Sequence, residues 1–498
     1  MRLRIGTFHQ TNYPWGDRQH DYDDNPELDY LSGYHAYFGQ CSHVKIDYTM
    51  TRTRFAPSPT GYLHIGNLRT AIYAYAMAKH AGGDFILRIE DTDQERLVPE
   101  GVADIKNILT VFGLAWDEFY VQSERKAAGL YQAAAKRLVS DGHAFYCQCA
   151  AKNAKQEGFS SQLRDPCRDQ GLTSGAVKLK VPAGETVSYH DFVLRKDVSW
   201  DTDAVYDATL LKSDGFPTYH LAAMTDDLAM HVTHVLRGHD WLPSTPIHLL
   251  VFKYLGGDRP EIGHLSDIQS SKGGKLSKRR DAVFVEQFLQ DGFLPEALLN
   301  FVILLGWAPK DNRELFTLPE FVAAFDPGGF QKSNPLYSDK KLNWFNGHYI
   351  RQKTDTELTQ LVKPFVKTDI SLDKLTQIIA IAKERMAKLS DIDGIIKQAV
   401  VAPVSYDKAL FTSDALVCLQ SVLQVVKLSP FTDPDRVNEE FKQEIDRLRL
   451  KTGDFYMNLR VALTNSRFTP PITELGTAVI GKSETLHRIE NALEYLKS

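Results

Sequence analysis

Two short segments carry residues suited to handling a phosphate chain. The first, Pro57 to Asn67, reads Pro-Ser-Pro-Thr-Gly-Tyr-Leu-His-Ile-Gly-Asn, and His64 stands two residues before Gly66. An imidazole can donate to a phosphate oxygen, and the start of a helix offers free backbone N–H groups to an anion. On its own, however, a loop with two glycines is more often only a turn.

The second segment lies far downstream and is rich in lysine. Residues 270–280 read Ser-Ser-Lys-Gly-Gly-Lys-Leu-Ser-Lys-Arg-Arg. A run of positive charge is usually a solvated surface loop. Lysines on a glycine-containing loop can also close over a triphosphate and stabilise the charge that develops on pyrophosphate. The segment is therefore either a surface loop or a clamp over a nucleotide.

The elements around the first segment predict how it is held. Residues 51–55 alternate as a short strand, residues 68–81 show apolar side chains at helical spacing, and Phe85–Ile89 reads as a buried strand. Gly82 and Gly83 would end the helix. This strand–loop–helix–strand order is typical of a nucleotide-binding, Rossmann-like α/β unit with a parallel sheet.

Composition excludes several classes of protein. The chain has 498 residues, 43% of them hydrophobic and 24% charged, with a formal net charge of −5. It is therefore not a histone-like nucleic-acid binder, although a local basic groove is compatible with this charge. The most apolar run, Ala297–Trp307, is too short to span a bilayer. Five cysteines, an odd number, argue for a reducing compartment, and we expect a cytoplasmic protein without membrane contact.

The first fifty residues differ in texture from the rest. They are rich in Tyr, Asp, His and Gly and show no helical or strand period. They also lack the apolar core of a secretory signal, and they are too acidic for a transit peptide. Two interpretations stay open: residues 1–50 are a disordered extension, or translation begins at Met50 and the upstream residues are not native.

The two phosphate-handling segments and several further blocks resemble one known family. His64-Ile-Gly-Asn67 and Lys275-Leu-Ser-Lys-Arg279 resemble the two signatures of class I aminoacyl-tRNA synthetases. The closest resemblance is to bacterial and organellar glutamyl-tRNA synthetases, and it is strongest from about residue 50 to residue 350. The blocks that carry it are residues 54–67, 85–93, 211–220, 237–246, 292–300 and 341–346.

The resemblance implies a two-step reaction. Glutamate and ATP, with Mg²⁺, give glutamyl-adenylate and pyrophosphate, and the glutamyl group then passes to the terminal adenosine of tRNA. No protein nucleophile is required, so catalysis consists of positioning and charge stabilisation. The expected partners are L-glutamate and either tRNA(Glu) alone or tRNA(Gln) as well, and a monomer is expected.

The resemblance also implies roles for single residues. A carboxylate substrate calls for arginine, which keeps its proton, and an ammonium group calls for a carboxylate. The glutamate-binding residues would be Arg54, Ala56, Ser58, Glu90, Tyr219 and Arg237; the ATP-binding residues would be His64, Gly66, Asn67, Asp240 and Lys278; the catalytic residues would be His64, Lys275 and Lys278. Which arginine holds which glutamate carboxylate stays open. Asn67, Ala223, Leu228 and His239 depart from the residues usual in the family and put details of amino-acid binding in question.

A cysteine group in the middle of the chain is a candidate zinc site. Cys147, Cys149 and Cys167 could grip one tetrahedral metal, with Asp169 as the predicted fourth ligand and His143 nearby. The alternative is three free thiols, because the set is incomplete without a certain fourth ligand.

The last third of the chain predicts helices. Residues 375–389, 416–428, 437–450, 453–463 and 483–497 show apolar side chains at helical spacing. The expected organisation is an extension (1–50), a catalytic domain (51–350) with an acceptor-stem-binding insertion at about 115–205, and an all-helical anticodon-binding domain (351–498). A dimerisation bundle is the alternative for that last domain.

Three other functions fit the sequence less well. A shorter paralogue in the same family glutamylates a modified tRNA base, but it lacks a helical C-terminal third. The helical pattern after residue 350 of this chain therefore argues against that function. A non-catalytic RNA-binding paralogue would be expected to lose His64 or Lys278, and both are present. A cytidylyltransferase would not explain Arg54 with Glu90, nor the C-terminal helices.

Overall fold

A computed structural model describes residues 50–149, 163–277 and 283–498. Met50 to Ser498 belong to one unit. Residues 1–49 lie outside the described residues, so the two interpretations of that segment stay predictions. None of the helices formed by the described residues is long and apolar enough to cross a bilayer.

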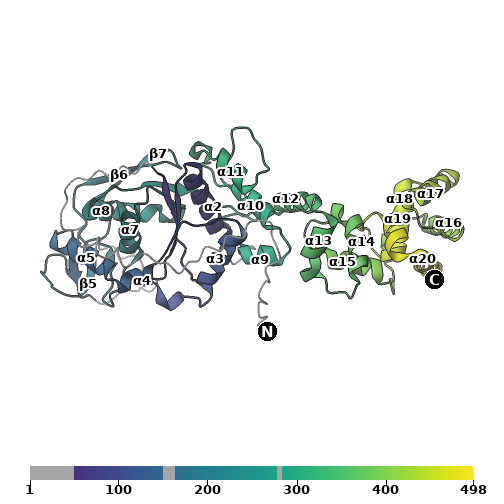
Figure 1. Cartoon of the computed structure of the whole chain (residues 1–498), viewed down its shortest axis with the longest axis horizontal. Helices are drawn as coiled ribbons and strands as arrows, with labels where there is room; N and C mark the ends of the chain where they lie inside the picture. The colour runs from purple at the N-terminus through teal and green to yellow at the C-terminus, as the bar shows by residue number, and fades with distance from the viewer. Residues whose placement is uncertain (1–49, 150–162, 278–282) are drawn as a thin grey trace. The chain divides into compact units, whose positions relative to one another are not determined.

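The centre of the first half is a mostly parallel sheet (Figure 1) with the strand order β3-β2-β1-β9-β10-β6-β7. Each pairing is parallel except that of β6 with β7 at the edge. The strands are β1 (Arg52–Phe55), β2 (Asp84–Ile89), β3 (Glu118–Val121), β6 (Thr186–Asp191), β7 (Lys196–Asp201), β9 (His234–Gly238) and β10 (Glu261–Leu265). The Rossmann-like parallel sheet expected from the sequence is confirmed.

Both faces of this sheet are covered, because successive side chains of a strand point to opposite sides. In β2, Phe85, Leu87 and Ile89 belong to one apolar core, whereas Ile86 belongs to the other. The first core includes α2 (Ile65–His80) and α3 (Gly101–Val111). The second includes α5 (Leu130–Ser140), α7 (Tyr219–Ala229) and α8 (Thr245–Leu255).

A smaller antiparallel sheet lies within residues 144–211. Its strands are β4 (Ala144–Cys147), β5 (Ala176–Leu179) and β8 (Thr209–Leu211), in the order β4-β5-β8. The short α4 (Gln122–Ala127) precedes α5. The end of β4 and the described residues between β4 and β5 carry the cysteine group.

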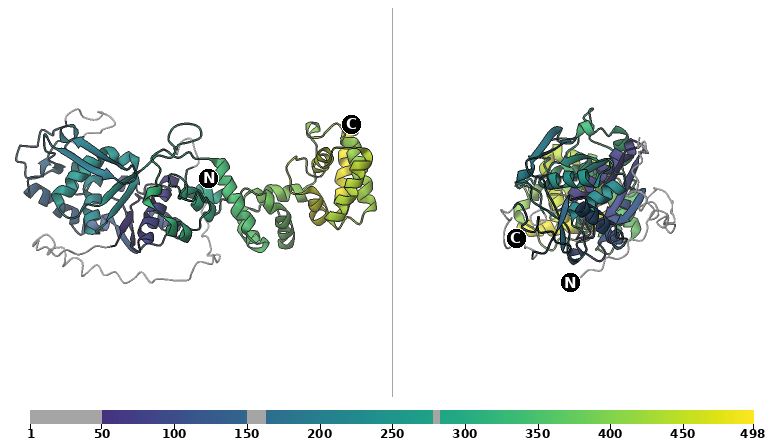
Figure 2. Two further views of the ribbon diagram at one scale, coloured as in Figure 1. Left: turned by 90° about the horizontal axis from the view of Figure 1, so that it is seen from above. Right: turned by 90° about the vertical axis from the view of Figure 1, so that its left-hand side faces the viewer.

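The second half of the described chain is helical (Figure 2). Side-chain caps begin several of these helices; the Thr354 hydroxyl and Glu357 carboxylate, for example, cap each other's backbone N–H groups. The helices are α9 (Val285–Gln290), α10 (Pro295–Ile303), α11 (Leu318–Ala324), α12 (Asp339–Gln352), α13 (Asp355–Val362), α14 (Leu372–Ala382), α15 (Asp391–Val400), α16 (Ala415–Leu428), α17 (Pro434–Leu448), α18 (Thr452–Thr464), α19 (Ile472–Glu474) and α20 (Lys482–Lys497). The expected helical C-terminal region is confirmed.

Deleting residues 1–49 is expected to leave the melting temperature and the activity almost unchanged. Strand β1 begins at Arg52 and takes its place between β2 and β9 through partners that all lie after Met50. Thermal unfolding and tRNA charging should be compared between the full chain and a chain that starts at Met50. An insoluble or inactive shortened protein would show that the first segment contributes to the fold.

Candidate active site at the carboxyl ends of the central strands

Three of the predicted glutamate-binding residues lie at the carboxyl ends of neighbouring strands. Arg54 lies near the end of β1, Glu90 directly follows β2, and Arg237 lies near the end of β9. These strands are adjacent in the order β2-β1-β9, and all are parallel. The connections run outward in opposite directions from β1 and β9, which is the point where ligands bind in open α/β sheets.

Tyr219, the first residue of α7, belongs to the same surroundings. Burial and the charge of Glu90 raise the pKa of Tyr219, while the charges of Arg237 and Arg54 act in the opposite direction. Its ring centroid lies 4.0 Å from that of Trp241. The structure thus brings Arg54, Glu90, Tyr219 and Arg237 together.

The loop after β1 carries the other two predicted contacts. Ala56 is half-buried and Ser58 is exposed. The backbone N–H of Glu90 donates to the carbonyl of Pro57 at 3.0 Å, so this hydrogen bond ties the loop to the residue after β2.

Two buried residues that the sequence reasoning missed complete this group. Asp227 accepts from Arg54 Nε (3.2 Å) and from Arg88 Nη1 (2.7 Å). Arg88 also donates from Nη2 to Glu90 Oε1 (3.0 Å). Burial raises the pKa of Glu90, although Arg88 and Arg54 oppose that shift. The sequence signal that could have identified such residues is a charged residue inside an otherwise apolar run, such as Arg88 within Phe85–Ile89.

Arg237 has a different set of partners. Its Nε donates to His264 Nε2 (3.0 Å), its Nη1 lies 2.9 Å from His248 Nδ1, and its Nη2 donates to Thr245 Oγ1 (2.9 Å). Within residues 50–149, 163–277 and 283–498, no ion pair joins Arg237 to a carboxylate. Burial lowers the pKa of Arg237, an effect that nearby Tyr219 opposes.

The predicted phosphate segment forms the start of α2. His64 is the N-cap residue, and its Nδ1 accepts from the N–H of Gly66 at 2.9 Å. A Cβ on Gly66 would come within 3.2 Å of the same nitrogen, so a larger residue would press on the imidazole. Asn67, the next residue, is exposed. The segment therefore has the geometry of a helix N-terminus open to an anion.

Two hydrogen bonds join the first signature segment to residues that follow the second. The N–H of Ile65 donates to the carbonyl of Val283 (2.9 Å), and the N–H of Val285 donates to the carbonyl of Leu63 (3.0 Å). Upstream, the N–H of Leu276 donates to the carbonyl of Ile268 (2.8 Å). The residues that follow the lysine segment are thus held beside the predicted ATP site, and Leu276, within the segment, is held by Ile268.

Lys275 and Asp240, both predicted site residues, form an ion pair. The ammonium group lies 2.5 Å from Asp240 Oδ2 and 3.0 Å from Asp267 Oδ1. Burial disfavours the charged amine, but hydrogen bonds to these two carboxylates raise the pKa of Lys275. The predicted roles of Lys278 and Arg279 fall outside the described residues.

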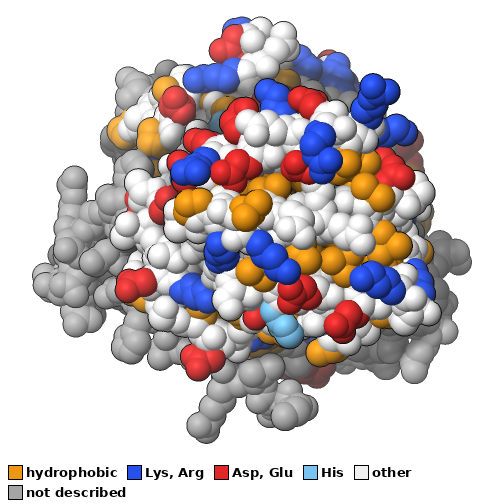
Figure 3. All heavy atoms as spheres, turned by 90° about the vertical axis from the view of Figure 1, so that its right-hand side faces the viewer, with side chains coloured by type: hydrophobic (Ala, Val, Ile, Leu, Met, Phe, Trp, Pro, Cys, Tyr) orange, Lys and Arg blue, Asp and Glu red, His pale blue; other side chains and the backbone are white. Residues whose placement is uncertain are grey.

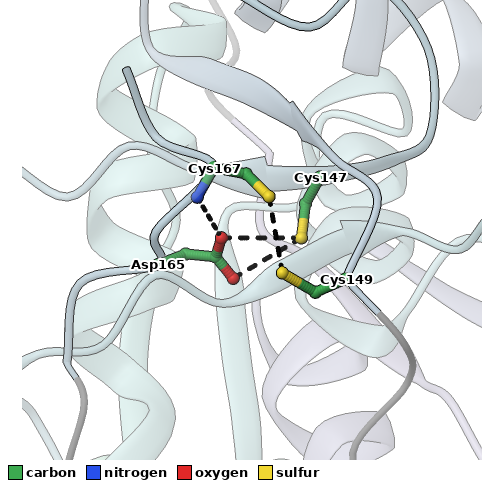
Figure 4. A group of neighbouring side chains, drawn as sticks. All are labelled: Cys147, Cys149, Asp165 and Cys167. Atoms are coloured by element: carbon green, nitrogen blue, oxygen red, sulfur yellow. Dashed lines mark hydrogen bonds between the residues drawn. The ribbon is translucent and has the colours of Figure 1, made fainter. Parts of the chain in front are cut away.

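The cysteine group converges on one point (Figure 4). Single ligand atoms of Cys147, Cys149, Cys167 and Asp165 all lie within 4.8 Å of one another. The Sγ atoms of Cys149 and Cys167 are 3.4 Å apart, and Cys147 Sγ is 3.5 Å from both Asp165 carboxylate oxygens. Zn–S bonds of about 2.3 Å in a tetrahedron place sulfur atoms slightly less than about 4 Å apart, so this donor set fits zinc.

Asp169, the predicted fourth ligand, does not belong to this group. Its side chain is 79% exposed and pairs with Lys180 at 3.0 Å. Asp165 takes its place because the chain turns there: the N–H of Cys167 donates to Asp165 Oδ1 (2.9 Å), which folds the carboxylate back toward the thiols. His143 instead stacks on Tyr254, with ring centroids 3.8 Å apart.

Two family models match this chain. Residues 50–344 match the catalytic domain of the class I tRNA synthetases (E and Q), and residues 357–493 match an anticodon-binding domain. The chain belongs to the class I tRNA synthetase family.

Relatives and solved structures within that family are similar over most of the chain. A glutamate–tRNA ligase of Dehalococcoides mccartyi is 37% identical over 480 residues, which cover 89% of this chain and 98% of the relative. One of Borreliella burgdorferi is 35% identical and covers 90% of this chain and 99% of the relative. A crystal structure of a glutamate–tRNA ligase from Elizabethkingia meningosepticum in complex with its amino acid has a TM-score of 0.77 at 32% identity, over 90% of this chain and 99% of that chain.

Proposed function

We propose that this protein is a glutamate–tRNA ligase that forms glutamyl-adenylate from glutamate and ATP and then charges the terminal adenosine of tRNA. The observation that carries the proposal is the set of buried charges at the ends of β1, β2 and β9. Among the described residues, Arg54 and Arg88 form ion pairs with Glu90, Asp226 and Asp227, whereas Arg237 forms none with a carboxylate.

This charge set fits glutamate better than glutamine. The free amino acid glutamate carries two carboxylates and one ammonium group, so it has one net negative charge, whereas glutamine has none. A pocket that contains a guanidinium without a carboxylate partner, that of Arg237, is complementary to that net charge. Glu90 would hold the ammonium group, and Tyr219, Ala56 and Ser58 would line the pocket.

The residues proposed for ATP are those around the start of α2. The N–H groups there and the dipole of α2 would face the phosphates, with Gly66 and Asn67 closest to the helix start. Mg²⁺ would accompany ATP as part of the substrate. Asp240 would act with Lys275, and Lys278 would stabilise the charge on the departing pyrophosphate.

The proposed domains follow the expected boundaries. Residues 51–350 would be catalytic, about 115–205 would contact the acceptor stem, and 351–498 would bind the anticodon. On the face formed by the C-terminal helices (Figure 3), Lys and Arg side chains lie among acidic and hydrophobic ones. Phe468, which is 87% exposed, follows Arg467, and an exposed aromatic ring beside a cation is suited to stacking on an unpaired base. We propose a cytoplasmic monomer.

ATP–pyrophosphate exchange tests the proposal directly. We expect exchange that depends on glutamate and not on glutamine, measured with and without tRNA. Charging of tRNA(Glu) and tRNA(Gln) transcripts then decides whether one tRNA or both are substrates. Absence of glutamate-dependent exchange in either condition would contradict the proposed function.

We further propose that Cys147, Cys149, Cys167 and Asp165 hold a structural zinc ion. Four protein ligands leave no open position, so the metal would brace the loop between β4 and β5 and take no part in the reaction. Lys178, whose Nζ lies 2.5 Å from Asp165 Oδ2, would orient the carboxylate.

Removing the Asp165 carboxylate is expected to lower zinc content. Asp165→Asn should weaken zinc binding at least about tenfold, because a neutral amide is a poorer ligand than a carboxylate. Asp169→Asn is the matched control and should leave zinc content unchanged, since Asp169 pairs with Lys180 instead. Metal analysis of both purified variants provides the measurement. Equal zinc loss in both, or no zinc in the unmodified chain, would refute the assignment.

A further inference from the structure

We propose that His248, His264 and Thr245 are positioning residues that hold the Arg237 guanidinium by neutral acceptors, and so keep its charge uncompensated for a substrate carboxylate. This inference rests on the proposed role of Arg237 in glutamate binding. It assigns a function to three buried residues that have no other role in the proposed glutamate site or in the phosphate segment.

The contacts of Arg237 determine which ring nitrogens carry protons. His264 Nδ1 lies 2.7 Å from Asp191 Oδ2, and its Nε2 faces Arg237 Nε at 3.0 Å. A carboxylate only accepts and a guanidinium only donates, so His264 is protonated at Nδ1 and accepts at Nε2. The Tyr189 hydroxyl donates to the same Asp191 oxygen at 2.7 Å.

His248 follows the same logic. Its Nδ1 faces Arg237 Nη1 at 2.9 Å, so Nδ1 must accept. Its Nε2 lies 3.0 Å from His220 Nδ1 and therefore donates to it. A proton on either accepting nitrogen would face a guanidinium N–H group, so both imidazoles stay neutral. Burial accordingly lowers the pKa of His264 to about 4 and that of His248 well below its usual range.

Thr245 completes the cradle. Its hydroxyl accepts from Arg237 Nη2 at 2.9 Å and donates to the carbonyl of Trp241 at 3.2 Å. All three partners are fully buried. Three N–H groups of the guanidinium are therefore fixed in direction by groups that carry no charge, and Asp191, the negative charge behind His264, is separated from Arg237 by the imidazole ring.

The other buried guanidiniums of the pocket are held in the opposite way. Arg54 and Arg88 both donate to Asp227, and Arg88 also donates to Glu90. A carboxylate partner cancels much of the field that a guanidinium presents to a ligand, whereas an imidazole or hydroxyl acceptor orients it and leaves the charge in place. Arg237 is thus the guanidinium best prepared to receive a substrate carboxylate.

The test is a matched pair of substitutions at His248. Asn and Asp have nearly the same shape and place an oxygen close to the position of Nδ1, but only Asp brings a negative charge to Arg237. We expect the glutamate KM of His248→Asp to exceed that of His248→Asn by about tenfold or more, because the new carboxylate competes for the guanidinium. The ATP KM should differ little between the two variants, and their melting temperatures should be similar.

Equal glutamate KM values for the two variants would overturn the inference, as would a rise in the ATP KM as large as that in the glutamate KM. If His248→Asp does not fold, the same comparison is made with Thr245→Asn and Thr245→Asp. The variant Arg237→Gln distinguishes the proposed role of Arg237 in glutamate binding from the proposed role of its neutral partners. If that variant keeps the normal glutamate KM, the proposed role of Arg237 is wrong; if it raises the glutamate KM while the Asn and Asp variants agree, only the neutral cradle is wrong.

Discussion

Replacing Lys278 by alanine is expected to lower the rate of glutamate-dependent ATP–pyrophosphate exchange by about a hundredfold or more. The reason is that a cation on this segment meets a charge that develops on pyrophosphate during the reaction, and loss of one such donor commonly costs about two orders of magnitude or more. Val283, which follows this segment in the chain, accepts a hydrogen bond from Ile65 at the start of α2, the helix terminus proposed to face the phosphates. The ATP KM should change much less than the rate, because the interaction forms mainly in the transition state.

Lys272→Ala is the matched control for this measurement. Lys272 lies on the same segment and is exposed, but it is not one of the proposed catalytic residues. Its exchange rate should stay close to that of the unmodified chain. A near-normal rate for Lys278→Ala, or an equal loss in both variants, would contradict the assignment of Lys278.

Replacing Arg237 by glutamine is expected to raise the glutamate KM by about a hundredfold and to remove most of the preference for glutamate over glutamine. A buried charge left without its partner costs several kcal/mol, which corresponds to about two decades in specificity. Arg237→Lys keeps a charge but not the fixed directions of the guanidinium, so it should recover only part of the affinity.

Arg54→Gln should behave differently. Arg54 is the partner of Asp227, so its loss leaves that carboxylate with Arg88 alone and should lower the melting temperature as well as glutamate affinity. We expect the discrimination against glutamine to survive better in this variant. Kinetics of glutamate and glutamine activation for both variants provide the measurement. If both keep normal discrimination, charge complementarity does not set the amino-acid choice, and the departures from the family at Ala223 and His239 are the positions to test next.

Local patterns in the sequence predicted the strands and the helix around the first phosphate segment and five of the C-terminal helices. The strands at β1 and β2 agree with the structure to within one residue, and the helices at 416–428, 437–450, 453–463 and 483–497 correspond to α16, α17, α18 and α20 within about three residues at either end. Two boundaries were wrong for local reasons. Helix α2 begins at Ile65 because His64 caps it, and the helix predicted to reach residue 389 ends at Ala382.

The supporting residues of the site could not be predicted in the same way. Arg88, Asp227, His248 and His264 lie on different elements, and their contacts join positions far apart in the chain, as between Arg54 and Asp227. Periodicity reports only which face of an element is apolar, and it says nothing about which distant polar group meets a buried one. For the cysteine group, spacing identified the three cysteines, but a tight turn at Asp165 determines which carboxylate lies beside them.

The strand order has a consequence for the order in which this protein can assemble. β1 pairs with β2, only about thirty residues away, but on its other side it pairs with β9, where Thr53 meets His234. When a nascent chain has been synthesised only as far as β3, it contains Arg54 and Arg88 but not yet their partner Asp227. The edge of β1 that later pairs with β9 is then unpaired. The proposed amino-acid pocket cannot form until Arg237 and its supporting residues up to His264 have been synthesised, so glutamate can stabilise the catalytic fold only after that point.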